Sequence, residues 1–166
     1  MNEQKFISEL KSQFNGTQVE FAGEASFVIE SGDLLPVVQK IREMGFERLS
    51  DITTVDYLSE EPRFHMVYQF TSIKNQATLS LRVKVSGLNP AVETVEAVYP
   101  SANWKEREAF DMFGIDFKNH SDLRRILMPA DWEGHPLRKD YPLGYEEPQF
   151  TFNFEEIGVR KPAPKE

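Results

Sequence analysis

Two segments of the first half carry hydrophobic residues at the spacing of one helix face. The first segment ends at Asn15-Gly16, and its apolar residues are Phe6, Ile7, Leu10 and Phe14. The second has Ser31 or Asp33 as its cap, Pro36 in its first turn and Gly45 at its end, and its apolar residues are Leu34, Val37, Val38, Ile41 and Met44. Both patterns predict amphipathic helices that lie on a sheet.

Other segments alternate apolar and polar residues, which predicts strands. Two short strands, at 19–21 and 27–29, flank a turn at 22–24, and a third is expected within 46–58. The clearest alternation is at 64–71 and 79–86, and these two strands should pair through a turn near Asn75. One face of this hairpin is apolar and should meet the core, while the other should meet water or a partner.

The pattern changes after Gly87. A short helix is expected around residues 92–98, followed by a helix from Asn103 to Gly114, in which Asn103 and Glu106 have the spacing of a capping box. Beyond His120 the periodicity fades, while Pro, Gly, Trp and paired charges become frequent. A segment that cannot form its own core usually lies on another surface.

These elements predict an α+β fold, a two-layer domain in the order helix, two strands, helix, three strands, with a mixed or antiparallel sheet and helices on one face. A C-terminal helical and irregular docking segment completes the chain. We expect residues 1–117 to form the domain and residues 118–166 to form an extended docking segment and tail.

Composition narrows the function without assigning one. The chain has 166 residues, a net charge of −8 and no cysteine, so a thiol nucleophile and a Cys-ligated cluster are excluded, and nucleic-acid binding is disfavoured. No Gly-rich phosphate loop, nucleophile elbow or apolar run of bilayer length occurs. The first residues lack the pattern of a secretory signal, so we expect the protein to stay in the cytosol.

The charged residues allow two interpretations. His120, Asp122 and His135 could form a carboxylate–histidine metal site, although their spacing matches no ligand motif. Arg107 and Asp111 are one helical turn apart, and we expect Asp111 or a carboxylate of a neighbouring subunit to hold Arg107. Charged residues placed among aromatics suit a polar network at a contact between subunits.

Three runs resemble one known family. They are residues 104–117 (WKEREAFDMFGIDF), 120–128 (HSDLRRILM) and 131–143 (DWEGHPLRKDYPL), and a weaker match is 49–57 (LSDITTVDY). These runs resemble the thirty-kilodalton subunit of respiratory complex I, called the C subunit in bacterial NADH:quinone oxidoreductase. Ser121 departs from the family, which usually has Pro between the His and the Asp.

The resemblance implies a noncatalytic subunit of the peripheral arm, on the cytoplasmic side of the cell membrane, in a hetero-oligomer. It implies docking against the forty-nine-kilodalton or D subunit, which helps form the quinone site and is called the quinone-site subunit below. It implies no cofactor in this chain, with FMN, iron–sulfur clusters and quinone held elsewhere in the complex. Membrane contact should come only through the complex. The expected interface residues are Trp104, Glu106, Arg107, Glu108, Asp111, Phe113, His120, Asp122, Arg124, Arg125, Trp132, His135, Arg138, Lys139, Asp140 and Tyr141.

Two alternatives remain open. The same scaffold could serve a ferredoxin- or F420-dependent complex or a membrane-bound hydrogenase. More remotely, the chain could be a small metal-dependent enzyme that uses His120, Asp122 and His135.

Overall fold

The computed structural model describes residues 3–21 and 24–142. In these residues the elements in chain order are α1 (Glu3–Gln13), β1 (Thr17–Phe21), β2 (Glu24–Glu30), the 3-10 helix η1 (Ser31–Asp33), α2 (Leu34–Glu43), β3 (Arg48–Asp56), β4 (Phe64–Ser72), β5 (Ala77–Val85), β6 (Ala91–Glu93), α3 (Ala102–Phe113) and β7 (Asp116–Lys118). The α+β prediction is confirmed. The predicted turn at 22–24 falls largely outside the described residues.

The main sheet has the strand order β1-β2-β5-β4-β3. The predicted hairpin is confirmed, because β4 and β5 are antiparallel and pair Tyr68 with Leu81. The sheet is mixed, since β2 runs parallel to β5 and pairs Ser26 with Ser80. A parallel pair needs a crossover, and α2 supplies it between β2 and the β3–β5 meander.

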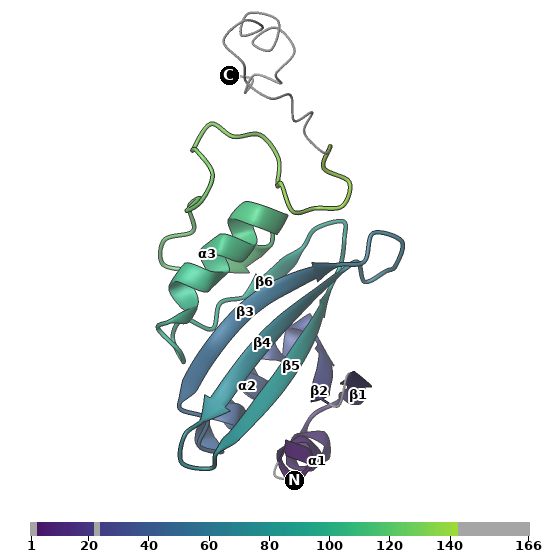
Figure 1. Cartoon of the computed structure of the whole chain (residues 1–166), viewed down its shortest axis with the longest axis vertical. Coiled ribbons are helices and arrows are strands. Elements are labelled where there is room, and N and C mark those ends of the chain that lie inside the picture. Colours follow the sequence, from purple (N-terminus) through teal and green to yellow (C-terminus); the bar gives the residue numbers. More distant parts are fainter. Residues whose placement is uncertain (1–2, 22–23, 143–166) are drawn as a thin grey trace, which may run out of the picture.

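The core lies on one face of this sheet. The residues Phe27, Met66, Tyr68 and Leu81 point to that face and share one hydrophobic cluster with Leu10 of α1, Val38 of α2 and Ala109 of α3. Figure 1 shows α2 behind β3, β4 and β5. The opposite face carries the polar alternate positions, including Gln69, Ser80, Arg82 and Lys84. The predicted apolar core face is confirmed, and the opposite face is mainly polar, although Val67 and Ser80 on it are buried.

A second, small parallel pair frames α3. β6 pairs with β7, with Val92 opposite Phe117, and α3 is the crossover between them. The prediction of a helix around 92–98 was wrong, because its first part is β6 and its remainder is a turn in which the Tyr99 amide donates to the Val95 carbonyl. The Tyr99 hydroxyl donates to the Phe46 carbonyl at 2.6 Å and ties this turn to the start of β3.

After β7 the chain runs to Pro142 through turns and bends, without a further helix or strand among the described residues. Figure 1 shows this segment (119–142, yellow-green) passing over the end of α3. We call it the wrapping segment. The expected domain boundary at 117/118 falls inside β7, and the division into two parts stays a prediction.

Candidate docking site around α3

The helix α3 carries the charged residues of the first family-like run. It begins at Ala102 after Ser101, one residue before the prediction, and ends at Gly114, whose φ of 70° is left-handed. The Gly114 amide donates to the Phe110 carbonyl at 2.8 Å, which closes the last turn as expected for a C-terminal glycine. The predicted capping box was wrong, because the Glu106 side chain points into the core instead of capping the helix.

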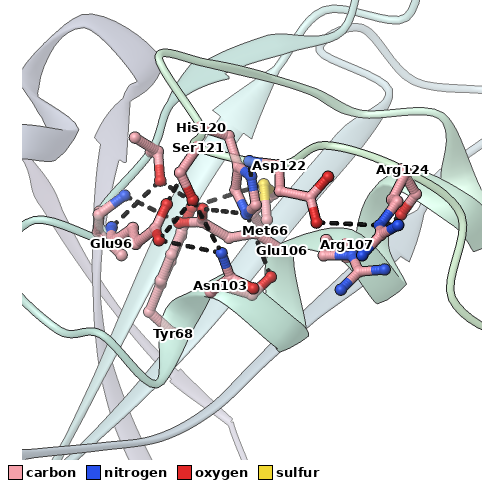
Figure 2. Close-up of polar contacts among 12 residues, drawn as sticks. Met66, Tyr68, Glu96, Asn103, Glu106, Arg107, His120, Ser121, Asp122 and Arg124 are labelled. Atoms are coloured by element: carbon pink, nitrogen blue, oxygen red, sulfur yellow. Dashed lines mark hydrogen bonds and ion pairs between the residues drawn. The ribbon is translucent and has the colours of Figure 1, made fainter.

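Glu106 is fully buried and bound by the turn after β6. Its carboxylate accepts the Thr94 hydroxyl at 2.5 Å and the Val95 amide at 2.8 Å. The His120 Nε2 atom lies 3.8 Å from the same carboxylate and 3.2 Å from the Asn103 carbonyl (Figure 2). Burial raises the pKa of Glu106 against the effect of these donors. This arrangement fixes α3 to β6 and encloses the His120 ring.

Glu96 holds the start of the wrapping segment. Its carboxylate accepts the Ser121 hydroxyl at 2.8 Å, the Ser121 amide at 3.1 Å and the Asn103 side-chain amide at 3.0 Å (Figure 2). The Ser121 hydroxyl is the main cause that lowers the pKa of Glu96. Proline at position 121 would have no amide hydrogen to donate to Glu96, whereas Ser121 donates both its amide and its hydroxyl.

Asp111 organises the middle of the wrapping segment. Its Oδ2 accepts the amides of residues 126, 127 and 128 at 3.0, 2.8 and 2.8 Å, while Oδ1 accepts Arg125 Nη1 at 2.6 Å. Burial would raise the pKa of Asp111, but the hydrogen bonds from Met128 and Arg125 and from the other two amides hold it below its usual range. Arg125 also donates to the carbonyls of Trp132 and Gly134. The predicted pairing of Asp111 with Arg107 was therefore wrong, because Arg125 takes that position.

Arg107 is 6% exposed and binds carbonyl groups. Its Nε and Nη2 atoms donate to the carbonyls of Arg124 and Arg125 at 3.1 and 3.3 Å, and its guanidinium carbon lies 5.1 Å from the centre of the Trp104 ring. Among residues 3–21 and 24–142, no carboxylate forms an ion pair with this guanidinium.

Arg63 fixes the end of the wrapping segment to the sheet. It donates two hydrogen bonds of 2.8 Å to Asp56 and two of 2.8 Å to Asp140, and Asp56 also accepts the Lys139 amide at 2.8 Å. Arg63 lowers the pKa of both carboxyls, that of Asp140 to about 2. Asp56 is a buried carboxylate at the end of β3, and this contact supplies its counter-charge.

Two more predicted interface residues, His135 and Arg138, also tie the wrapping segment to the end of α3. Arg138 donates to the carbonyls of Phe113 and Gly114, and His135 Nδ1 lies 3.0 Å from the Asp111 carbonyl. The Tyr141 hydroxyl donates to the Glu133 carbonyl at 3.4 Å. The half-buried Phe113 packs against the core.

Fewer than half of the predicted interface residues are exposed to solvent. Of the predicted residues, those that are exposed are Trp104, Glu108, Asp122, Arg124, Trp132, Lys139 and Asp140. Leu127 and Leu137, at 61% and 54%, add exposed apolar surface. Glu106 and Asp111 are fully buried within this chain, Arg107 keeps 6% of its surface exposed, and the assignment of the surface to an interface stays a prediction.

The metal-site interpretation gains no support from this geometry. His120 lies against Asn103 near the start of α3, whereas His135 lies against Asp111 near its end. Eight helical residues separate these positions by roughly 12 Å, too far for two ligands of one ion. Across the described ranges, no three His, Asp or Glu side chains are placed to hold a metal ion.

Comparison with known proteins gives a consistent result. Residues 27–147 match the family described as the respiratory-chain NADH dehydrogenase 30 Kd subunit. The NADH-quinone oxidoreductase C subunit of Roseiflexus sp. (strain RS-1) is 47% identical over 150 residues, covering 89% of this chain and 86% of that protein. The protein of the same name from Geobacter sulfurreducens is 42% identical, covering 82% of this chain and 88% of its own length.

Two solved structures share the fold. A trypsin-resistant fragment of Nqo5 superposes with a TM-score of 0.67 at 28% identity, covering 72% of this chain and 98% of that fragment. A chain of the membrane-bound sulfane sulfur reductase, an archaeal respiratory membrane complex, gives a TM-score of 0.75 at 17% identity, covering 98% and 95% of the two chains. No helix among residues 3–21 and 24–142 has the length and apolar character that a bilayer crossing needs.

Proposed function

Because the chain belongs to the family of the respiratory-chain NADH dehydrogenase 30 Kd subunit, we propose that it is a noncatalytic structural subunit in the peripheral arm of a proton-translocating NADH:quinone oxidoreductase. Its partner is the quinone-site subunit. The complex carries electrons from NADH through FMN and iron–sulfur clusters to quinone, and these groups belong to other subunits. The chain lies on the cytoplasmic side of the cell membrane and meets the membrane only through the complex.

One observation carries the scaffold role. The carboxylates Asp56, Asp111 and Asp140 lie in the family-like runs. Through Arg63 and Arg125 they hold the wrapping segment on α3 and the sheet. These groups are already hydrogen-bonded within the chain, so they shape a surface instead of awaiting a substrate. That surface presents Trp104 and Leu127, residue types suited to a protein contact.

Deletion of the gene tests the proposal. We expect membranes of the deletion strain to lose NADH:quinone activity and the assembled complex, and a plasmid copy to restore both. Assembly and turnover at wild-type levels without this chain would contradict the scaffold role.

The electron donor and the partner need separate measurements. Activity of wild-type membranes with NADH, and little with reduced ferredoxin or reduced F420, is expected, whereas the reverse preference would favour a related complex with another donor. Peptide identification after native purification of the tagged chain should recover the quinone-site subunit, and its absence would exclude it as the partner.

A further inference from the structure

Arg107 differs from the other arginines that hold the wrapping segment. Arg125 and Arg63 are each paired with carboxylates, at 2.6 and 2.8 Å. Arg107 is more buried than either, yet among the described residues its charge is met only by the two carbonyls and the Trp104 ring. Carbonyl dipoles and a ring face compensate a buried cation less than a carboxylate does.

The hydrogen-bonding capacity of Arg107 is also incompletely used. A guanidinium has five N–H donors. The contacts within residues 3–21 and 24–142 engage Nε and Nη2, and none engages Nη1. One edge of the guanidinium therefore remains available, and a planar carboxylate matches such an edge with two parallel hydrogen bonds.

Trp104 supplies apolar surface beside this edge, and Leu127 adds more one turn further along α3, where its amide binds Asp111. Trp104 precedes Arg107 by one turn of α3 and is 62% exposed, although its ring stacks on the guanidinium. Residues 124–128 run along the same side of the helix, from the carbonyls at Arg107 to the amides at Asp111, and Leu127 projects outward from them. Figure 2 shows Arg107 beside Arg124, whose exposed side chain pairs with Asp122.

We propose that Trp104 and Arg107 form the receptor for one aspartate or glutamate side chain of the neighbouring quinone-site subunit, with an apolar residue of that subunit packed on Trp104 and Leu127. This inference rests on the proposed function. The carboxylate completes the hydrogen bonds of Arg107 and neutralises its charge, and the tryptophan excludes water from the pair. Large aromatic and arginine residues at such positions dominate the binding energy of interfaces.

The charge of the surroundings favours a protein carboxylate over a polyanion. Arg124 is paired with Asp122, and Glu108 is exposed one residue after Arg107. The whole chain has a net charge of −8. A phosphate backbone needs several cations on one face, and a single carboxylate needs one.

Chromosomal variants, followed by native purification of the complex in mild detergent, test the inference. The apparent affinity of the Arg107→Met and Trp104→Ala chains for the complex should fall at least about 100-fold. Arg107→Met leaves the partner's carboxylate buried without a counter-charge, and Trp104→Ala removes the ring that excludes water from the pair. Arg107→Lys should keep the charge and restore part of the retention, since lysine lacks the two-point geometry. Arg48→Ala is the matched control, an exposed arginine at the start of β3 that lies outside the predicted interface and whose loss should leave retention unchanged.

Thermal unfolding of each purified chain separates docking from folding. Trp104 is largely exposed, so Trp104→Ala should unfold within a few degrees of the wild type while it loses retention. Retention of Trp104→Ala and Arg107→Lys equal to that of Arg48→Ala would overturn the inference. If the wild-type chain itself fails to co-purify with the complex, the proposed function fails first.

A photoreactive phenylalanine analogue at position 104 identifies the occupant. We expect a cross-link to a peptide of the quinone-site subunit that contains an aspartate or glutamate. A cross-link to residues 143–166 of the same chain, or to a peptide without a carboxylate, would overturn the proposal.

Discussion

Asp111 and Glu96 each bind several donors from residues that lie far along the chain. Asp111 accepts three consecutive amides at 126–128, and Glu96 accepts both the amide and the hydroxyl of Ser121. Backbone amides without a sheet or helix partner need an acceptor, and these carboxylates provide it. Two side chains thus replace the regular hydrogen bonding that the wrapping segment lacks.

We expect Asp111→Asn to destabilise the chain by about 3–5 kcal/mol, since Arg125 loses its counter-charge and an amide group faces three amide donors. Urea unfolding of the purified chain measures this change. Trypsin should also cleave faster after Arg124 and Arg125 because their segment opens. Asp116→Asn, at an exposed position of β7, is the control and should unfold as the wild type. A stability equal to that of the control would show that Asp111 does not organise the segment.

The end of α3 is also the contact for the last part of the wrapping segment. A Cβ atom built on Gly114 would lie 2.5 Å from the His135 ring and 2.7 Å from Arg138 Nη2. The glycine is thus required twice, once for its positive φ and once for the close approach of these two side chains.

We expect Gly114→Ala to lower the free energy of unfolding by about 1–3 kcal/mol, because alanine is strained at a positive φ. Displacement of His135 and Arg138 should lower it further. Gly32→Ala is the matched control, because nothing lies within 4 Å of its Cβ position and its φ is not positive. The control should stay within about 1 kcal/mol of the wild type. Urea unfolding measures both variants. Equal denaturation midpoints for Gly114→Ala and Gly32→Ala would contradict the close packing of His135 and Arg138 on Gly114.

Periodic elements were predictable from sequence, and short or distant contacts were not. The strands β4 and β5 each have nine residues, enough positions to show alternation. β6 and β7 have three residues each, too few to show a period, and they pair across α3. Because residues 92–98 were interpreted as a helix, the acceptors and donors around Thr94 and Glu96 were missed.

The candidate site shows the same limit. The family-like runs identified the charged residues of α3 and the wrapping segment, but their partners depend on tertiary structure. Helical spacing favoured Arg107 with Asp111, whereas the fold brings Arg125 to Asp111. Arg63 and Asp140 are 77 residues apart, and nothing in the local pattern links them. The carboxylate of Asp56 at the end of a strand was the one local signal of that network.

Stability of the whole molecule should depend on pH through groups that act in opposite directions. Arg63 and the donors to Asp111 lower the pKa of Asp56 and Asp111, so their stabilisation is present above the ordinary value of 3.8 and is lost as pH falls through the lowered values. Burial lowers the pKa of His135, which also reduces stability as pH falls through its ordinary value of 6.5. Glu106 acts oppositely, because burial raises its pKa and the folded state holds the proton longer.

Stability contributed by protonated Glu106 is therefore lost as pH rises from the ordinary value of 4.5 through the raised one. In Glu106→Gln this loss should disappear, and the amide can still accept the Val95 amide. Urea unfolding between about pH 5 and pH 8 measures the free energy of unfolding of the wild type and of the variant. The wild-type value minus the variant value should decline as pH rises, by at most about 1.4 kcal/mol per pH unit. A difference that does not change with pH would show that Glu106 titrates equally in both states.

The parallel pairing of β2 with β5 has a consequence for the time that the chain needs to fold. β3, β4 and β5 follow one another and can pair through short turns, whereas Ser26 meets Ser80 across 54 residues. Closing a loop of that length has an entropic cost of about 3.5 kcal/mol before any pairing energy is gained. The barrier to folding should therefore lie at the joining of β2 to a preformed meander. Ser26→Ala, which removes the hydroxyl that donates to Ser80, should then slow refolding in stopped-flow experiments more than it speeds unfolding.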